Sequence, residues 1–166
     1  MPAVSTKLGP GTLILGEVGT GQDASCQLTG AVVGWSKDKA DDVTVLCGDV
    51  VAGGTTYTAT LSGTFLQDLT ADDGIVAFTW DNKGTQVPFT FVPNTDAGAT
   101  VTGQVVIDPI DVGSTDDYGS TMTSDFEWDC VGEPAIAFGG VGGGALSAES
   151  SSEVGTEDPL AEPVNA

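Results

Sequence analysis

The sequence predicts an all-β domain with one short flanking helix, folded as a β-sandwich or open barrel. Several stretches alternate apolar and polar residues with a period of two, which is the pattern of half-buried strands. Turn residues separate these stretches, and glycine occurs 24 times in 166 residues. One stretch between two strands carries helix-capping residues instead. A hydrophobic content of 40% favours a folded core over a disordered chain.

The clearest strand runs from Thr56 to Phe65. One predicted face carries Tyr57, Ala59, Leu61, Gly63 and Phe65, and the other carries only threonine and serine. Threonine suits the solvated face of a strand because its branched side chain fits the pleated surface. We therefore expect a half-buried strand with its threonine face in solvent.

A short helix is expected from Ala71 to Lys83. Thr70 followed by Asp73 has the form of a capping box, and Gly84 can close the helix at its C-terminal end. A strand remains the alternative, because Val76, Phe78 and Trp80 also alternate and a helical Gly74 costs about 1 kcal/mol relative to alanine. Caps at both ends favour the helix.

The remaining strands follow from the same period of two. They are expected at 12–18, 26–35, 43–47, 87–91, 101–107, 126–130 and 135–138, which makes eight strands in all. Residues 1–11 are expected to form an N-terminal arm, residues 12–138 the β-sandwich domain, and residues 139–166 a flexible acidic tail rich in glycine and serine. Residues 19–23 are expected to form a turn.

The charge of the chain is strongly one-sided. Twenty-four acidic residues face four lysines, with no arginine and no histidine, which gives a formal charge of −20. Such a chain is expected to repel DNA and anionic lipid over about one Debye length, near 8 Å at physiological salt. The charge balance therefore disfavours nucleic-acid binding by phosphate neutralisation. No stretch of sequence reaches the length of a membrane span.

The segment Ser36–Asp42 holds two of the four lysines and is expected to be a loop. Its simplest interpretation is a solvated loop. The alternative is a contact between subunits, in which scarce lysines meet the acidic residues of a neighbouring copy. The candidate contact residues are Lys37, Asp38, Lys39, Asp41 and Asp42.

The chain lacks the side chains of most catalytic sites. Without histidine there is no Ser-His or Cys-His pair, and without arginine there is no bidentate phosphate clamp. The paired carboxylates are Asp41-Asp42, Asp72-Asp73 and Asp116-Asp117. They can serve glycoside hydrolysis or bind calcium, but exposed turn residues of an acidic protein explain them more simply. We expect no enzyme activity, no cofactor and no metal.

Cysteine and tryptophan leave further alternatives. Cys26, Cys47 and Cys130 are an odd number in a chain without a signal peptide, so we expect reduced, mostly buried thiols made in a cytoplasm. A zinc site is disfavoured because the chain has no CxxC. The tryptophans Trp35, Trp80 and Trp128 can line a sugar-binding platform, although core positions suit them better.

Several pieces of the chain, in their order and spacing, resemble one family. These pieces are LGPGTLILGEVG, VTVLCGDV, TYTATLSGTFLQDLTADDGIVAFTWDNKGTQVPFTFVP and SDFEWDCVGEP. They look like the major tail (tail tube) proteins of long-tailed bacteriophages, particularly those that infect actinobacteria. The resemblance covers residues 7–133.

The resemblance implies a structural virion protein without catalytic residues. Such proteins form hexameric rings that stack into a tube through which the genome passes, with strands of all subunits joined into an inner barrel. The implied partners are further copies of the chain and other tail proteins such as the tape measure and the terminator. The implied location is the virion tail, after synthesis in the host cytoplasm.

Two strand faces are candidates for the lumen of such a tube. One is the acidic face of the strand at 126–130, formed by Asp125, Glu127 and Asp129, and the other is the threonine face of 56–64. Both are polar and free of lysine. The alternatives from other classes are an acidic β-sandwich module that binds glycans or proteins, and another virion part such as a tail terminator or a head decoration protein.

Overall fold

The computed structural model describes residues 5–139. Within this range the chain forms ten strands and one helix. The strands are β1 (Thr12–Leu15), β2 (Gln22–Asp23), β3 (Leu28–Lys39), β4 (Val43–Thr44), β5 (Val50–Val51), β6 (Thr55–Leu66), β7 (Gln86–Val92), β8 (Thr100–Val106), β9 (Thr123–Asp129) and β10 (Ala135–Ala137). The helix α1 (Ile75–Asp81) connects β6 to β7.

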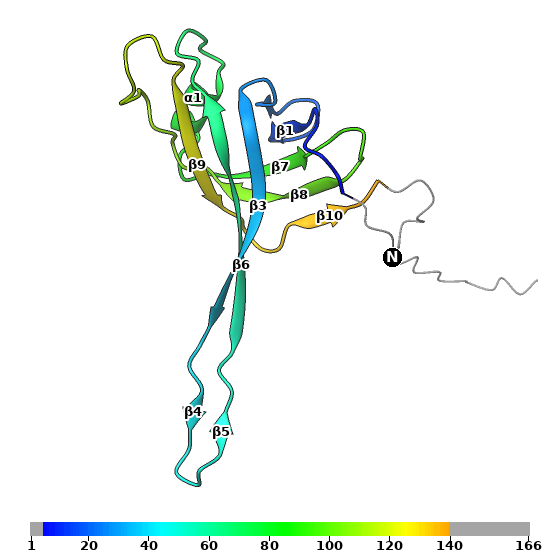
Figure 1. Ribbon diagram of the computed structural model, residues 1–166, viewed down its shortest axis with the longest axis vertical. Helices are drawn as coiled ribbons and strands as arrows, with labels where there is room; N and C mark the ends of the chain where they lie inside the picture. The colour runs from blue at the N-terminus through cyan, green and yellow to red at the C-terminus, as the bar shows by residue number, and fades with distance from the viewer. Residues whose placement is uncertain (1–4, 140–166) are drawn as a thin grey trace, which may run out of the picture.

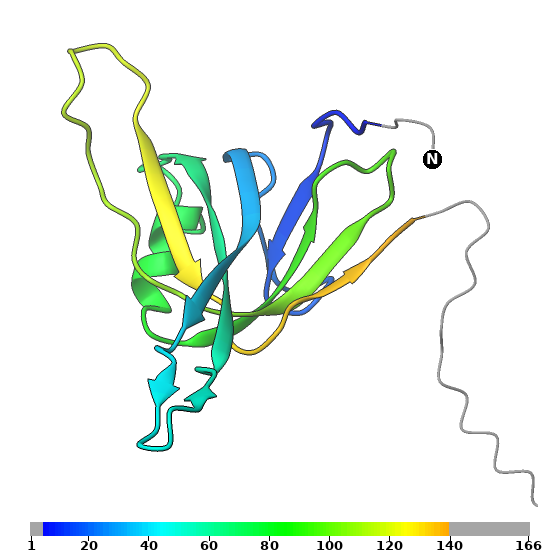
Figure 2. The same ribbon diagram turned by 60° about the horizontal axis from the view of Figure 1, so that its bottom comes forward.

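Two antiparallel sheets form the body of the molecule (Figure 1). One sheet has five strands in the order β10-β8-β7-β1-β2, and the other has three strands in the order β3-β6-β9. Figure 2 shows α1 beside the three-stranded sheet. The predicted class, all-β with one short flanking helix, is confirmed, and the sheets form an open sandwich rather than a closed barrel.

The core lies between the two sheets and is closed at one end by the helix. The three-stranded sheet contributes a cluster of aromatic rings, in which Phe126 stacks on Phe65 at a centroid distance of 4.3 Å and lies 4.5 Å from Trp128. The five-stranded sheet contributes aliphatic and phenylalanine side chains, and Ile75 of α1 is fully buried against them. The indole N–H of Trp128 donates to the carbonyl of Asp108 at 2.9 Å, so this buried polar group is satisfied.

Strands β3 and β6 are each 12 residues long, and they continue well beyond the body (Figure 1). Their pairing runs without interruption from Gly30 opposite Thr64 to Lys39 opposite Thr55. Beyond it the two-residue strands β4 and β5 pair with each other. We call residues 36–58 the hairpin extension, and its end, residues 43–51, the tip.

The structure corrects the expected loop at Ser36–Asp42. Ser36–Lys39 belongs to β3, and only the residues after Lys39 leave the strand. Polar and charged side chains are compatible with this strand because both faces of the extension lie in solvent and the ladder itself satisfies the backbone. Tyr57 was expected on the face of its strand that carries the apolar residues. It is 56% exposed, because it belongs to the extension and lies beyond the core.

The helix is shorter than expected and lacks the predicted cap. It begins at Ile75 after Gly74, with no side-chain hydrogen bond at its N-cap. The Thr70 hydroxyl donates instead to the carboxylate of Asp68 at 2.7 Å, and Gln27 from a distant loop accepts the N–H of Ile75 at 3.1 Å. Gly84 lies three residues past Asp81 with φ +73° and donates to the carbonyl of Ile107.

Other strand boundaries differ from expectation at the ends. The strand expected at 43–47 covers only Val43–Thr44, and the turn expected at 19–23 contains β2. Both are two-residue pairings whose residues are too few to show a period of two. The strand expected at 26–35 starts at Leu28, and the one expected at 12–18 stops at Leu15. Apart from Gly139, the tail expected over 139–166 lies outside the described residues, and the expected N-terminal arm is described from Ser5 onward.

Candidate functional site

The two candidate lumen faces form one continuous surface. In the β6–β9 register, Thr60 is opposite Asp129, Ser62 is opposite Glu127 and Thr64 is opposite Asp125. Directly opposed residues of an antiparallel pair point to the same side of the sheet. The acidic residues of β9 and the hydroxyl residues of β6 therefore share the outer side of the three-stranded sheet, which we call the acidic face.

Burial separates the acidic face sharply from the core side. Along β9 the residues alternate between exposed and buried, with Asp125, Glu127 and Asp129 exposed and Phe126 and Trp128 buried. This is the alternation predicted from the sequence. The Thr64 hydroxyl donates to the Asp125 carboxylate at 2.6 Å across the two strands. The acidic face is thus a polar layer on top of an aromatic layer.

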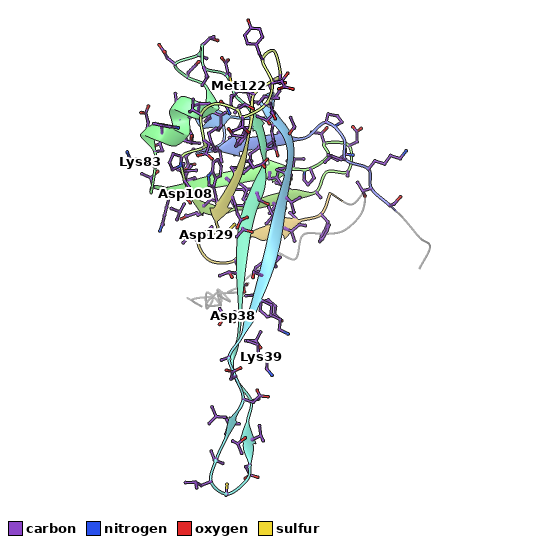
Figure 3. The ribbon with its side chains drawn as sticks, turned by 60° about the vertical axis from the view of Figure 1, so that its left-hand side comes forward. Asp38, Lys39, Lys83, Asp108, Met122 and Asp129 are labelled. Carbon is purple, nitrogen blue, oxygen red and sulfur yellow. The ribbon has the colours of Figure 1, made fainter. Side chains whose placement is uncertain are left out.

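Strand β3 extends the acidic face toward the hairpin extension. Ser36 is opposite Thr58, and Asp38 is opposite Thr56, so both are on the side that carries Thr60 and Asp129. Figure 3 shows Asp129 at the end of β9 and Asp38 farther along the extension. The two lysines of this region are on the other side, because Lys37 is opposite Tyr57 and Lys39 is opposite Thr55.

The five residues predicted as a subunit contact therefore divide between two surfaces. Asp38 belongs to the acidic face, whereas Lys37 and Lys39 are on the opposite side of β3. Asp41 and Asp42 lie in the exposed connection between β3 and β4. The structure brings Lys39 and Asp42 together, with Nζ 3.1 Å from Oδ1.

Hydrogen bonding lowers the pKa of Asp42. The backbone N–H of Gly53 donates to its carboxylate at 2.8 Å and is the main cause, and Lys39 is the second. Gly53 comes from the returning half of the hairpin, so the Asp42 carboxylate ties the two halves together below the tip. Both residues of the ion pair are exposed, and such a pair adds little to stability.

The tip concentrates exposed apolar side chains in a short stretch of chain. Its exposed large hydrophobic residues are Val43, Val45, Leu46, Val50 and Val51. Leu46 at the turn has its whole side chain in solvent, and Cys47 beside it is also exposed. Clustered exposed apolar residues commonly mark an interaction site. Sequence reasoning missed this surface because it assigned 43–47 to the sandwich, where valines at alternate positions belong in the core.

The edges of the two sheets differ in length. The five-stranded sheet ends in β2, with two residues, and β10, with three. The three-stranded sheet ends in β3, with 12 residues, and β9, with seven. Long open edges offer unpaired backbone groups to another strand, and short ones do not. The sheet that carries the acidic face is therefore also the sheet that can pair with a neighbour.

The cysteines differ from expectation. Cys26 and Cys47 are exposed, and Cys130 is half-buried, so the expected burial of most thiols is wrong. Burial beside the core raises the pKa of the Cys130 thiol, and the charge of Asp129 adds to this effect. The three thiols are free in the structure.

The other residues singled out in the sequence lie apart. Trp128 is in the core, Trp35 is on β3 and Trp80 is on α1, where its N–H donates to the carbonyl of Ile110 at 3.0 Å. The three rings do not form one platform. Within residues 5–139, no group of three or more histidine, cysteine, aspartate or glutamate side chains is placed to hold a metal ion. No helix in the described part of the chain is long and apolar enough to cross a membrane.

Comparison with known proteins identifies the fold. No protein-family model matches the chain. No curated protein sequence matches it either. Among solved structures, a chain from the virion of a native gene transfer agent particle matches with a TM-score of 0.50 and 19% identity, covering 76% of this chain and 94% of that one. A chain from the tail of an empty gene transfer agent particle, refined with C6 symmetry, matches with a TM-score of 0.51 and 22% identity, covering 76% and 93%. The open β-sandwich described above is thus the fold of a chain in a sixfold-symmetric, phage-like tail.

Proposed function

We propose that the chain is the tail tube subunit of a phage-like particle. Six copies form a ring, rings stack into a tube in the virion tail, and the genome passes through the lumen. The observation that carries this proposal is the fold shared with a chain of a C6-symmetric tail. Its role is structural and needs no cofactor.

The open edges of the three-stranded sheet supply a joint between subunits. β3 of one copy can pair with β9 of the next, because each strand has one edge without a partner among the described residues. Such a contact is heterologous, and a heterologous contact closes into a ring when the rotation per subunit divides a full turn. The short edges β2 and β10 disfavour the same pairing on the other sheet.

In this proposal the acidic face lines the lumen. The opposite side of the three-stranded sheet packs on the five-stranded sheet, which leaves the side with Asp125, Glu127 and Asp129 available to face the channel. Carboxylates repel the phosphates of DNA over about one Debye length, roughly 8 Å at physiological salt. The wall therefore keeps DNA from adhering as it moves.

Electron microscopy of the purified protein tests the proposal. We expect stacked rings at high protein concentration, and longer tubes at higher salt because salt screens the repulsion between acidic subunits. Single rings that do not stack point to a tail terminator. A protein that stays monomeric at all concentrations and salt conditions, with tryptophan fluorescence that responds to glycans, points to a binding module and contradicts the tube.

The lumen assignment has its own test. In the test variant, lysine replaces Asp125, Glu127 and Asp129 together. In the control variant, lysine replaces three exposed acids near α1, Asp72, Asp73 and Asp81. Both variants are expected to form tubes. Only the β9 variant is expected to slow DNA ejection from assembled particles and to retain short DNA in reassembled tubes. Normal ejection by the β9 variant would falsify the lumen assignment.

The hairpin extension provides contacts between subunits in this proposal. Its residues are exposed on both sides, and Lys37 lies among the exposed rings of Trp35 and Tyr57, where an acidic neighbour can meet it. Replacing Lys37 and Lys39 by glutamate adds four units of negative charge to each copy and is expected to shorten or abolish tubes. Tubes of unchanged length and stability count against this role.

A further inference from the structure

The body carries an apolar surface beside α1. Leu69, Trp80 and Val112 are 51%, 54% and 48% exposed, and together with Val76 they line a groove of about 510 Å³. The indole N–H of Trp80 donates to the carbonyl of Ile110 at 3.0 Å. A partner can therefore cover this ring without leaving its polar group unsatisfied. We call this surface the α1 patch.

A second groove lies between the N-terminal segment and the first residues of β3. It has a volume of about 340 Å³, and Leu8, Leu28, Ala31 and Pro93 supply apolar parts of its lining. The exposed Cys26 also lines it. The chain has a formal charge of −20, yet none of the described residues that line this groove carries a charge. We call it the β3 groove.

The α1 patch and the β3 groove lie on opposite flanks of the body. Figures 1 and 2 both show α1 with β9 on one flank, and the N-terminal segment with the end of β10 on the other. The segment after β8 connects α1 to β9, because Ile110 accepts the N–H of Trp80 and Asp108 accepts the N–H of Trp128. Each surface thus lies beside one of the two strand edges that the proposed ring joins.

The two surfaces also lie at the same end of the three-stranded sheet. Gln27, directly before β3, accepts the N–H of Ile75 at the start of α1 with its side chain at 3.1 Å. Its carbonyl accepts the N–H of Leu66, which is opposite Thr123 at the start of β9. Rotation about a ring axis keeps each residue at its height along that axis. The α1 patch of one copy and the β3 groove of the next therefore meet at one height.

We propose that the α1 patch of each copy packs into the β3 groove of the next copy in the same ring. Leu69 and Trp80 cover the apolar lining of the groove. The exposed Lys7, directly before Leu8 in the chain, meets Asp68 at the rim of the patch. The contact is heterologous, so each copy uses both surfaces when the ring closes. This inference rests on the proposed function, because it requires the ring.

Charge favours patch against groove over patch against patch. The backbone N–H and the hydroxyl of Thr70 donate to the Asp68 carboxylate at 2.9 and 2.7 Å, which lowers the pKa of Asp68 and keeps it ionised. Two α1 patches in contact would bring two such carboxylates together, and like charges at an interface are unfavourable. The β3 groove offers an uncharged lining with Lys7 beside it.

Cross-linking to Cys26 in the β3 groove tests the contact. The acceptor variant carries Cys47→Ser and Cys130→Ala, so that Cys26 is its only thiol. The donor variant also carries Cys26→Ser, together with Leu69→Cys in the α1 patch. The control donor carries Ile136→Cys instead, at a residue of β10 that is 55% exposed, against 51% for Leu69. Each donor thiol first reacts with one end of a short bis-maleimide, and the donor is then mixed with the acceptor and assembled.

The expected product is a covalent dimer of acceptor and Leu69→Cys donor, at least tenfold more abundant than the dimer with the Ile136→Cys donor. β10 ends on the same flank as the β3 groove, so Ile136 of one copy does not face Cys26 of another in the ring. Assembled mixtures without the Leu69→Cys dimer, or with equal dimer from both donors, overturn the contact but leave the ring intact. Absence of rings from the unmodified protein defeats the proposed function instead.

A second readout separates a contact within the ring from one between rings. Leu69→Asp is expected to leave the protein monomeric in electron microscopy and sedimentation. The control Gln104→Glu adds the same charge at an exposed residue of β8 and is expected to form rings. Leu69 is half exposed, so its variant should keep the circular dichroism spectrum and the unfolding midpoint of the parent. Normal tubes from Leu69→Asp, or isolated rings that do not stack, overturn the proposed contact.

Discussion

The two halves of the β3–β6 hairpin share one ladder but differ completely in their surroundings. In the body half of β6, Ala59, Leu61 and Phe65 are buried between the sheets. In the other half, all residues from Thr55 to Thr58 are exposed, and so is the facing part of β3. The body half has a second sheet to cover it, whereas the outer half is covered by nothing within residues 5–139.

The difference shows that an alternating pattern specifies a strand without specifying what covers it. Tyr57 continues the series of Ala59 and Leu61 without a break, yet it lies in solvent because the five-stranded sheet does not reach it. Apolar residues of the body half stabilise the monomer. Apolar residues of the outer half contribute little to the monomer and are available for association.

The largest effect on stability is expected for the aromatic layer of the body. Trp128→Ala removes a fully buried ring that contacts Phe65 and Phe126, and it should lower the free energy of unfolding by about 3–5 kcal/mol. The control is Tyr57→Ala in the outer half, where the ring is 56% exposed and the expected change is within about 0.5 kcal/mol. Urea unfolding of the unassembled protein measures both. Equal losses for the two variants contradict the comparison.

A smaller effect is expected at Gly63 of β6, where an added Cβ has no room. A Cβ at Gly63 collides with the carbonyl oxygen of Gly30 and lies 2.9 Å from a ring carbon of Phe126, so Gly63→Ala should cost about 1–3 kcal/mol. At Gly34 in the same ladder, the Cβ is 3.8 Å from the Thr60 hydroxyl, an ordinary contact. Gly34→Ala should therefore leave the urea midpoint almost unchanged. A shift for Gly34→Ala as large as for Gly63→Ala rejects this account.

Thiol reactivity provides a third comparison between body and extension. Cys47 on the tip should react quickly with a maleimide at neutral pH, whereas Cys130 should react at least about tenfold more slowly because burial raises its pKa and reduces its thiolate fraction. Mass spectrometry after short labelling measures the order. Raising the pH should accelerate the reaction of Cys130 with the maleimide. Equal labelling rates of Cys47 and Cys130 at neutral pH would contradict the burial of Cys130.

The smallest effect concerns the Asp42 carboxylate at the base of the tip. Its pKa is lowered in the folded chain, so its contribution is present above the unfolded pKa near 3.8 and is lost as the pH falls through the lower, folded pKa. Lys39→Met should raise the Asp42 pKa toward 3.8, and Lys37→Met on the same side of β3 should not. NMR titration of the Asp42 carboxyl carbon measures this. If Asp42 titrates at the same pH in both variants, Lys39 is not a cause of its lowered pKa.

Much of the fold follows from local patterns. The alternation in β6 and β9 predicted which of their residues are buried in the body, and Phe126 and Trp128 are where the period of two places them. The helix was harder to delimit because its first N–H, that of Ile75, donates to Gln27 from another part of the chain. No local pattern contains that contact. The two-residue strands β2 and β5 exist only through their partners.

The candidate site was predictable in its composition but not in its assembly. The acidic residues of β9 and the threonines of β6 were each recognisable as polar strand faces. That they form one surface depends on the register between two distant strands, in which Thr64 is opposite Asp125, 61 residues later in the chain. The hairpin extension could not be predicted, because the sequence does not show where the second sheet ends. The sequence holds one indication of it. Lysine occurs at every second position from Lys37 to Lys39, which continues the period of two of β3.

The acidic face has a further consequence for the electrical environment of a channel built from it. Its carboxylates are backed by aromatic rings, and the two lysines of β3, Lys37 and Lys39, are on the other side of the sheet. Dissolved cations must then supply the neutralising charge. A lumen lined by this face therefore holds a layer of mobile cations, in addition to the counterions that surround DNA. DNA moving through such a lumen is separated from the protein by exchangeable ions and makes few direct contacts with it.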